Sequence, residues 1–343
     1  MGIYLDNGYL DIERIRNTKC PFVFVVGGRA TGKTYGMLEN VVEHGEKFLF
    51  LRRTQTQLEQ IIKPEYSPFK SLNNDHEWDI VPASISKHTA GFYIAENVDN
   101  ELKPSGVPIG YAAALSTISN LRGFDASDVS VIIYDEFIAE AHERPLKNES
   151  AALFNAYETV NRNRELQGKP PVQMVCLANA NDLGNPIFLE LGLVKIAQKM
   201  RDKGTELWTD PKRGICLCIL QDSPISQRKS DTALYRLTAG SEFQSMSLDN
   251  AFADEHIGKI KPMPLKEYRP VVNVGEITVY RHKANREYYI SEHCTGSPPR
   301  FGSGDVDLSR FCKLYYWIWG EYVRGNIVFE SKVCEILLTR YFN

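Results

Sequence analysis

The chain has 343 residues, of which 43% are hydrophobic and 24% are charged, and its formal net charge is −3. These values are typical of a globular protein and exclude a disordered chain or a strongly basic nucleic-acid binder. No apolar run approaches the roughly 20 residues of a membrane-spanning helix, and residues 1–19 lack a signal-peptide core, so we expect neither a membrane segment nor export. The seven cysteines are scattered without metal-site spacing, which indicates reduced core thiols in a cytosolic protein.

The first half of the chain alternates short apolar segments with helical ones, a pattern typical of an α/β fold with a mainly parallel sheet. Phe22–Val26 and Phe48–Leu51 are apolar runs that predict buried strands, and residues 34–44 between them predict a helix. Residues 64–110 contain five prolines and are expected to form short antiparallel strands and loops. The strands of the predicted parallel sheet therefore come before and after this segment in the chain.

Three more apolar runs predict further strands of the same sheet, at Val129–Tyr134, Val172–Ala178 and Gly214–Leu220. Between the first two, Asn148 is expected to cap a helix that ends near Arg164. No further strand of this sheet is expected.

A polar, irregular stretch follows residue 220 and predicts a linker at 221–254 between a domain at 1–220 and a smaller α+β domain at 255–343. The small domain is expected to contain strands at Val271–Tyr280 and Glu287–Ser291, then helices at about 308–324 and 328–342. The first helix carries too many aromatic residues for one face. Packing in the domain core is the favoured interpretation, and a surface for a partner or nucleic acid is the alternative.

The segment directly after the first strand fits the pattern G-x-x-x-x-G-K-[ST] at every fixed position. This pattern forms a loop whose backbone N–H groups converge on phosphates at a helix N-terminus. The lysine would neutralise the β- and γ-phosphate oxygens, and the threonine hydroxyl would bind Mg²⁺. The sequence therefore predicts an ATP site with these residues: Gly27, Gly28, Arg29, Ala30, Thr31, Gly32, Lys33 and Thr34.

Asp135 and Glu136 directly follow the strand that ends at Tyr134. The first carboxylate is expected to hold Mg²⁺ together with Thr34, and the second to polarise the attacking water. A carboxylate beside the γ-phosphate suits hydrolysis better than phosphate transfer to a small molecule. The pair therefore favours an ATPase over a kinase.

Other polar residues are candidates on the sequence alone. Asn179, directly after the predicted strand Val172–Ala178, could contact the γ-phosphate or the attacking water, or could simply form a turn. One of Arg162 and Arg164 could serve a neighbouring subunit as an arginine finger, or both could complement the dipole at the helix C-terminus. Three further arginines are candidates for phosphate or base contacts: Arg29, Arg52 and Arg53.

Together, the motifs resemble those of the DNA-packaging (encapsidation) ATPases of small, short-tailed bacteriophages, motors of the terminase-like ASCE P-loop class. The resemblance covers about residues 15–255 and rests on segments that occur in the same order. These are Gly27–Thr34, Phe48–Arg53, Tyr134–Phe137, Thr159–Arg164, Cys176–Ala180 and Met246–Asn250. Leu121-Arg122-Gly123 also resembles a segment of large terminases.

The resemblance implies an ATPase in a homomeric ring, by family likeness a pentamer, that docks at the portal of a procapsid in the host cytoplasm. Such a ring drives double-stranded DNA inward, and in some relatives a structural RNA joins the motor. Lys33 and Thr34 would bind ATP, Asp135 would hold Mg²⁺, Glu136 would activate water and Arg162 would be the trans-acting finger. Another nucleic-acid translocase or helicase is the first alternative, and a non-enzymatic nucleotide-dependent scaffold is the second.

The resemblance further implies that the C-terminal domain has a ribonuclease H-like fold without nuclease activity. Its carboxylates, such as Glu267, Glu276, Asp305 and Asp307, are separated along the sequence, and no set is expected to converge from adjacent strands. We therefore expect this domain to contact DNA, RNA or the portal rather than to cleave nucleic acid.

Overall fold

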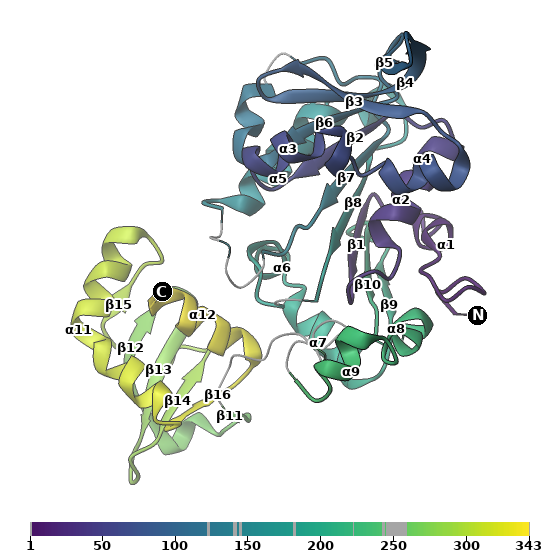
Figure 1. The fold of residues 1–343 in the computed structure, drawn as a ribbon. Coiled ribbons are helices and arrows are strands. Elements are labelled where there is room, and N and C mark those ends of the chain that lie inside the picture. The colour runs from purple at the N-terminus through teal and green to yellow at the C-terminus, as the bar shows by residue number, and fades with distance from the viewer. Residues whose placement is uncertain are drawn as a thin grey trace. The chain divides into compact units, whose positions relative to one another are not determined.

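The computed structural model describes residues 2–121, 124–139, 143, 146–180, 183–221, 223–241, 244 and 259–342. The chain forms two compact units (Figure 1). One unit contains Met1–Glu190 and Ala197–Ala253, and the other contains Leu191–Ile196 and Asp254–Asn343. Within the described ranges, no helix has both the length and the apolar character needed to cross a membrane.

The first unit is built on a ten-stranded sheet with the order β3-β4-β6-β2-β7-β8-β1-β10-β9, in which β5 pairs with β4. Its strands are β1 (Phe22–Val26), β2 (Phe48–Arg52), β3 (Ile80–Ser86), β4 (Thr89–Val98), β5 (Glu101–Pro104), β6 (Gly110–Ala114), β7 (Val131–Asp135), β8 (Gln173–Ala178), β9 (Leu207–Asp210) and β10 (Ile215–Ile219).

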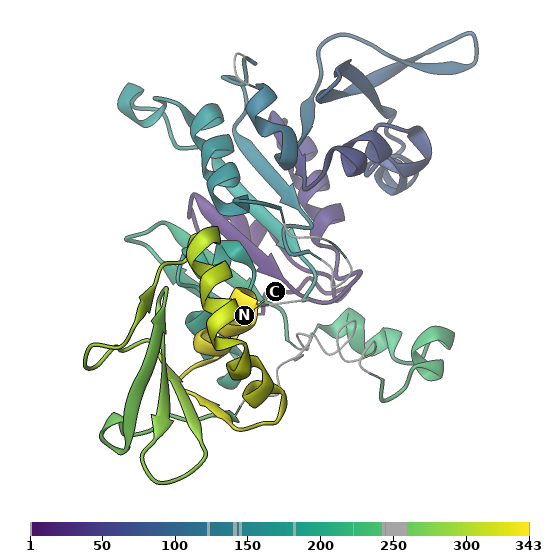
Figure 2. The same cartoon turned by 90° about the vertical axis from the view of Figure 1, so that its left-hand side faces the viewer.

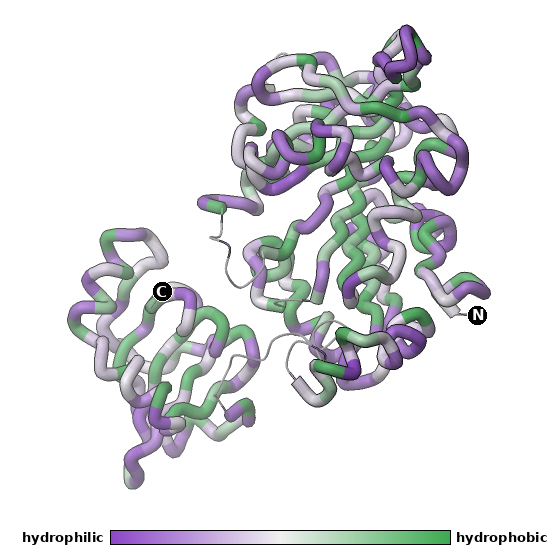
Figure 3. Tube along the Cα trace, viewed as in Figure 1, coloured by the Kyte–Doolittle hydropathy of each residue, from purple (hydrophilic) through white to green (hydrophobic). Residues whose placement is uncertain are grey.

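The six central strands, from β6 to β10 in sheet order, run parallel to one another. Antiparallel strands border them on both sides, β4 beside β6 and β9 beside β10. The central strands are apolar on both faces, as the hydropathy colouring of this unit shows (Figure 3). The predicted α/β class with a mainly parallel sheet is therefore confirmed.

Helices cover both faces of this sheet because alternate side chains of each strand point to opposite sides. On one face, Val23 and Phe50 join a buried cluster with Met37 of the helix that follows β1. On the other face, the ring of Phe24 lies 5.9 Å from that of Phe137 and 5.8 Å from that of Phe188. The helices are α1 (Ile12–Arg16), α2 (Lys33–Glu43), α3 (Gln55–Ile61), α4 (Lys70–His76), α5 (Glu149–Asn161), α6 (Pro186–Glu190), α7 (Val194–Asp202), α8 (Pro224–Lys229) and α9 (Ala233–Leu237).

The carboxyl ends of the parallel strands share one edge of the sheet, where open α/β sheets bind their ligands. The glycine-rich loop leaves β1 at this edge, Arg52 ends β2 and Asp135 ends β7. β8 lies between β1 and β7, so Asn179, which follows β8, stands between the loop and the acidic pair. The fold thus gathers residues that are far apart in the sequence.

The structure corrects several expectations for this unit. The proline-rich stretch contains the antiparallel strands β3, β4 and β5 but also the unpredicted helix α4, and its β4–β5 hairpin projects from the sheet (Figure 2). β9 was also missed, because only one edge of this four-residue strand is paired. Asn148 precedes α5 in a left-handed conformation, and its side chain makes no capping hydrogen bond with the described residues.

The second unit has a six-stranded sheet in the order β11-β16-β14-β13-β12-β15. Buried residues of this sheet form one core with residues of two helices, such as Phe311 and Leu338. The strands are β11 (Lys259–Ile260), β12 (Tyr268–Val274), β13 (Ile277–His282), β14 (Tyr288–Ser291), β15 (Arg300–Phe301) and β16 (Ile327–Phe329), and the helices are α11 (Asp305–Val323) and α12 (Lys332–Phe342).

Two predicted elements of this unit were wrong. The expected strand at Val271–Tyr280 is a hairpin of β12 and β13, because Gly275 adopts a positive φ of 51° and turns the chain. The expected helix at 328–342 begins only at Lys332, because residues 327–329 pair with β14 as the parallel strand β16. Hydrophobic periodicity alone does not separate a short buried strand from the start of a helix.

The aromatic residues of α11 divide between the core and the surface. Phe311 and Tyr322 are buried in the core, as the favoured interpretation predicted, whereas Tyr316 and Trp317 are exposed. The expectation of separated carboxylates also needs correction. Glu292 and Glu330 follow the parallel neighbours β14 and β16, and Glu330 accepts hydrogen bonds from the Ser291 hydroxyl and the Glu292 backbone, each at 2.9 Å. The likeness of this unit to a ribonuclease H-like fold stays a prediction.

Candidate functional site

The glycine-rich loop needs two of its glycines for different physical reasons. A Cβ atom on Gly27 would lie 2.6 Å from the side chain of Leu220, so the loop can leave β1 only where this residue has no side chain. Gly32 has a φ of 87° and immediately precedes α2, a conformation that L-residues with side chains rarely adopt. The loop therefore enters the helix with its first backbone N–H groups free of side-chain capping within the described part of the chain.

Lys33 is buried at the centre of the loop. Its ammonium donates hydrogen bonds to the carbonyl oxygens of Gly27 at 2.9 Å and Gly28 at 2.6 Å, and to the Thr31 hydroxyl at 3.2 Å. Burial lowers the pKa of Lys33 from its ordinary value to about 8, an effect that the Asp135 carboxylate opposes. A neighbouring anion such as phosphate would favour the charged form of this lysine.

The acidic pair lies across from the loop helix. The Thr34 hydroxyl donates a 2.9 Å hydrogen bond to one oxygen of Asp135, although the two residues are 101 positions apart. Asp135 is buried, whereas the side chain of Glu136 is 48% exposed. Glu136 also has a positive φ of 55°, which is uncommon for a residue other than glycine. The two neighbouring carboxylates therefore occupy different environments.

Arg52 and Arg53, which looked equivalent in the sequence, have separate roles. Arg52 contacts both members of the acidic pair, donating to Asp135 at 2.8 Å and forming an ion pair with Glu136. Arg53 is fully buried and pairs with carboxylates outside the acidic pair. It forms ion pairs with Glu149 at 3.0 Å and with Glu143 at 3.0 Å. The prediction that Arg53 contacts phosphate was wrong, because this guanidinium stabilises the packing of α5 against the sheet.

Arg162 and Arg164 lie at the opposite edge of the sheet from the loop. α5 begins after the carboxyl end of β7, and at its end the Asn161 side chain accepts a hydrogen bond from the backbone of Val172, just before β8. Arg164 donates to the carbonyl oxygens of Ser127, Val129 and Pro170 and so fastens local loops.

Arg162 differs from Arg164 in exposure and in backbone conformation. Its side chain is 48% exposed and its backbone adopts φ 45° and ψ −127°, outside the usual regions. The guanidinium donates to the carbonyl oxygen of Phe124 at 3.2 Å. Since α5 is about 20 Å long, Arg162 cannot reach the loop of its own subunit.

The remaining predicted residues have less defined surroundings. Asn179 is partly buried at the edge between the loop and Asp135, and Arg29 is exposed on the loop. The Met246–Asn250 segment lies outside the described residues, as do Arg122 and Gly123.

Two regions that sequence reasoning missed also border the loop. The ring of Tyr9 packs against Gly32, and the backbone of Leu10 donates a 3.0 Å hydrogen bond to the Thr31 carbonyl. From the other end of the unit, the Lys229 ammonium approaches the Ala30 carbonyl oxygen at 3.4 Å. No local sequence pattern marks these residues, because the only feature they share is that folding brings them close to the loop.

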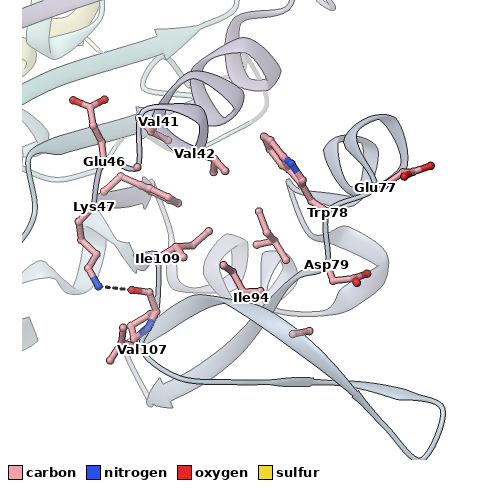
Figure 4. Close-up of a pocket in the computed structure, with 15 residues that line it drawn as sticks. Val41, Val42, Glu46, Lys47, Glu77, Trp78, Asp79, Ile94, Val107 and Ile109 are labelled. Carbon is pink, nitrogen blue, oxygen red and sulfur yellow. Dashed lines mark hydrogen bonds between the residues drawn. The ribbon is translucent and has the colours of Figure 1, made fainter.

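A pocket of about 650 Å³ lies away from this site (Figure 4). Its lining includes Val41 and Val42 from the end of α2, Lys47 from the start of β2, and Trp78. Lys47 donates a hydrogen bond to the Pro108 carbonyl at the rim. Because β2 begins here, this pocket is at the amino edge of the sheet and is separate from the glycine-rich loop.

A glycine-rich loop between a buried parallel strand and a helix, with its threonine hydrogen-bonded to a carboxylate at the end of a nearby parallel strand, defines a P-loop protein. Comparison with known proteins narrows this class. The family model of the Podovirus DNA encapsidation protein (Gp16) matches residues 4–271, and the chain belongs to this family. The resemblance inferred from the motifs is thereby confirmed.

Individual relatives agree with this assignment. The DNA packaging protein of Bacillus phage PZA is 31% identical over 255 residues, which are 72% of this chain and 65% of that protein. The DNA packaging protein of Bacillus phage phi29 is 31% identical over 249 residues, 71% of this chain and 64% of that protein. The match thus spans slightly less than two thirds of the length of either relative.

The fold is also found among solved structures. The bacteriophage Phi-29 viral genome packaging motor assembly contains a chain that aligns over the full length of both chains with a TM-score of 0.65 and 22% identity. At this level of identity the likeness concerns the fold, and it includes both units of the present chain.

Proposed function

We propose that this protein is an ATPase that drives double-stranded viral DNA into a preformed capsid. ATP binds at Gly27–Thr34, with Lys33 beside the β- and γ-phosphates. The observation that carries the proposal is the hydrogen bond between Thr34 and Asp135 at the mouth of the loop. It unites the two halves of a hydrolytic site that the sequence separates by 101 residues.

The residues at this contact fit Mg²⁺. The Thr34 hydroxyl and the Asp135 carboxylate are oxygen donors, which this hard cation prefers over nitrogen or sulfur. When bound, the ion would supply positive charge that offsets the negative charge developing on the phosphate oxygens. Thr34 and Asp135 would hold it, and Asn179, which follows β8 between β1 and β7, would contact the γ-phosphate.

Glu136 orients the attacking water and accepts its proton. The side chain of Glu136 is half exposed whereas that of Asp135 is buried, so we assign the metal to the buried carboxylate and the water to the exposed one. Arg52 forms ion pairs with both carboxylates and holds them at the sheet edge.

Arg162 completes the active site of a neighbouring subunit. It lies at the far edge of the sheet from its own loop, it is half exposed, and its backbone is strained. A guanidinium supplied in trans stabilises the transition-state charge and accelerates hydrolysis by orders of magnitude. This arrangement requires a ring or another closed homo-oligomer, because each site then depends on the next subunit.

Family membership supports the partners proposed for this chain. The protein acts in the host cytoplasm, docked at the portal of a procapsid, and in some assemblies beside a structural RNA. DNA contacts are made mostly to phosphates, because a packaging motor must be indifferent to sequence, and binding therefore weakens steeply with salt. The C-terminal unit, without nuclease activity, supplies contacts to nucleic acid or the portal, and the exposed Tyr316 and Trp317 of α11 support a contact role.

The test is ATP turnover at low salt with and without duplex DNA. We expect DNA to raise turnover of the wild type, and Glu136→Gln and Arg162→Ala each to lose it. Mixing the two inactive variants should restore turnover, because an Arg162→Ala subunit keeps its Glu136 and receives Arg162 from a Glu136→Gln neighbour. Glu158→Gln, an exposed change on α5, is the matched charge control and should behave as the wild type.

Two results would contradict the proposal in different ways. If mixing restores nothing although each variant assembles, the active site lies within one subunit. If turnover ignores DNA, the chain is an ATPase without the coupling that a packaging motor needs. Strand separation during turnover would instead indicate a helicase.

A further inference from the structure

The surroundings of the glycine-rich loop include a second lysine that the P-loop pattern does not contain. Lys229 is the last residue of α8, and its ammonium lies 3.4 Å from the carbonyl oxygen of Ala30, inside the loop. It reaches the loop from 199 positions away in the sequence. A cation in this position stands beside the backbone that surrounds the phosphates.

α8 is held at the loop by contacts that do not involve Lys229. Arg228 donates a 3.1 Å hydrogen bond to the carbonyl oxygen of Asn7. A Cβ atom on Gly8 would lie 3.2 Å from the side chain of Pro224, so the N-terminal segment and the start of α8 are in close contact. The same N-terminal segment joins the loop through the backbone hydrogen bond from Leu10 to Thr31. The position of Lys229 is therefore built into the packing.

The electrostatics agree with this placement. Burial lowers the pKa of Lys229, and after the larger effect of burial, the charges of Arg29 and Lys229 lower the pKa of Lys33. Three cations thus lie close enough to influence one another around a single loop. The Asp135 carboxylate balances part of this positive charge, and the remainder favours the binding of an anion at the loop.

The helix also carries buried hydroxyl groups near this lysine. Ser226 is one turn before Lys229, so the two share a face of α8, and Ser223 lies another turn earlier. Both serines are buried, and neither hydroxyl oxygen has a hydrogen-bond partner in the part of the chain that the structure describes. Both hydroxyl oxygens are hidden from solvent, so of these three residues only the partly exposed Lys229 is open to a phosphate at the loop.

We propose that Lys229 is a second phosphate-binding lysine of the nucleotide site and contacts the terminal phosphates of a nucleoside triphosphate. This inference rests on the proposed function and deepens it. The loop N–H groups and Lys33 bind nucleoside diphosphates and triphosphates alike. Lys229 contacts the additional negative charge of the triphosphate. The contact makes the position of α8 sensitive to the bound nucleotide.

The test is equilibrium binding of two fluorescent nucleotides, mant-AMP-PNP and mant-ADP, to the full-length protein. Lys229→Gln should weaken the triphosphate analogue about tenfold or more, the loss expected for a charge-assisted hydrogen bond, and change mant-ADP affinity less than about threefold. Lys229→Arg keeps the positive charge and should retain most of the affinity. Lys212→Gln, an exposed change in the turn between β9 and β10, is the control for net charge.

Thermal unfolding of each variant establishes that it is folded. Equal weakening of both nucleotides by Lys229→Gln would overturn the assignment to the terminal phosphates, and unchanged affinities would overturn the contact itself. Both results leave the proposed ATPase intact provided that the wild type binds and Lys33→Ala does not. A wild type that binds neither nucleotide would overturn the proposed function together with this inference.

Discussion

Both units of this protein end parallel strands in carboxylates, but the surroundings of those carboxylates differ. In the first unit, Asp135 and Glu136 end β7 beside a glycine-rich loop, where Asp135 meets the Thr34 hydroxyl and Arg52. In the second unit, Glu292 and Glu330 follow β14 and β16.

The carboxylates of the second unit bind local groups. Glu330 accepts from Ser291 and from the backbone, while Glu292 pairs with Lys195 at 2.5 Å and accepts from Ser331 at 3.2 Å. Carboxylates at strand ends are therefore not sufficient for a phosphate site. The first unit adds a loop of backbone N–H groups around a buried lysine, an arrangement that attracts an anion to this edge of the sheet.

The largest expected effect compares one carboxylate of each unit. Glu136→Gln removes the proposed base and should lower ATP turnover about 10²- to 10⁴-fold, the range for general base catalysis. Glu330→Gln keeps an oxygen that accepts the hydrogen bonds of Ser291 and Glu292, so its turnover should stay within about twofold of the wild type. Phosphate release under saturating ATP measures both. A large loss in Glu330→Gln would show that the second unit takes part in hydrolysis.

A smaller effect compares buried ion pairs. Glu149→Ala leaves the fully buried Arg53 without its main partner and should reduce the free energy of unfolding by about 3–5 kcal/mol. Glu321→Ala in the second unit should cost less, because its partners Arg286 and Arg324 are exposed and can be hydrated. Chemical denaturation monitored separately for each unit, by hydrogen exchange, measures the difference. Equal losses of unfolding free energy in the two variants would show that burial of the arginine does not determine how much its ion pair stabilises the protein.

The smallest effect concerns the entry to the loop. Gly27→Ala places a methyl group 2.6 Å from the side chain of Leu220. This change should lower the free energy of unfolding by about 1–3 kcal/mol, as overpacking of a tight core does. The second change Leu220→Gly should recover part of the mant-ADP binding that Gly27→Ala loses, because it removes the Cβ atom of Leu220 together with the rest of the side chain and so makes room for the added methyl group. If the double variant binds no better than Gly27→Ala, the glycine is needed for its backbone conformation rather than for space.

Much of the fold was predictable because it depends on local sequence. The apolar runs of β1, β2, β7, β8 and β10 are buried on both faces, so they stand out without knowledge of their neighbours. Prediction failed where an element depends on its neighbours. Residues 327–329 form β16 because β14 lies beside them, and only four residues of β9 pair with one edge of β10.

The sequence by itself determined the phosphate loop and its acidic counterpart, because each motif is a continuous segment in which residue type and spacing carry the chemistry. Tertiary structure alone decided which neighbouring side chains join them. Arg52 and Arg53 are adjacent in sequence, yet one meets Asp135 and the other is buried against Glu149. Lys229 borders the loop from 199 positions away. The physical reason is that side-chain direction and proximity depend on packing between distant segments, which no local pattern encodes.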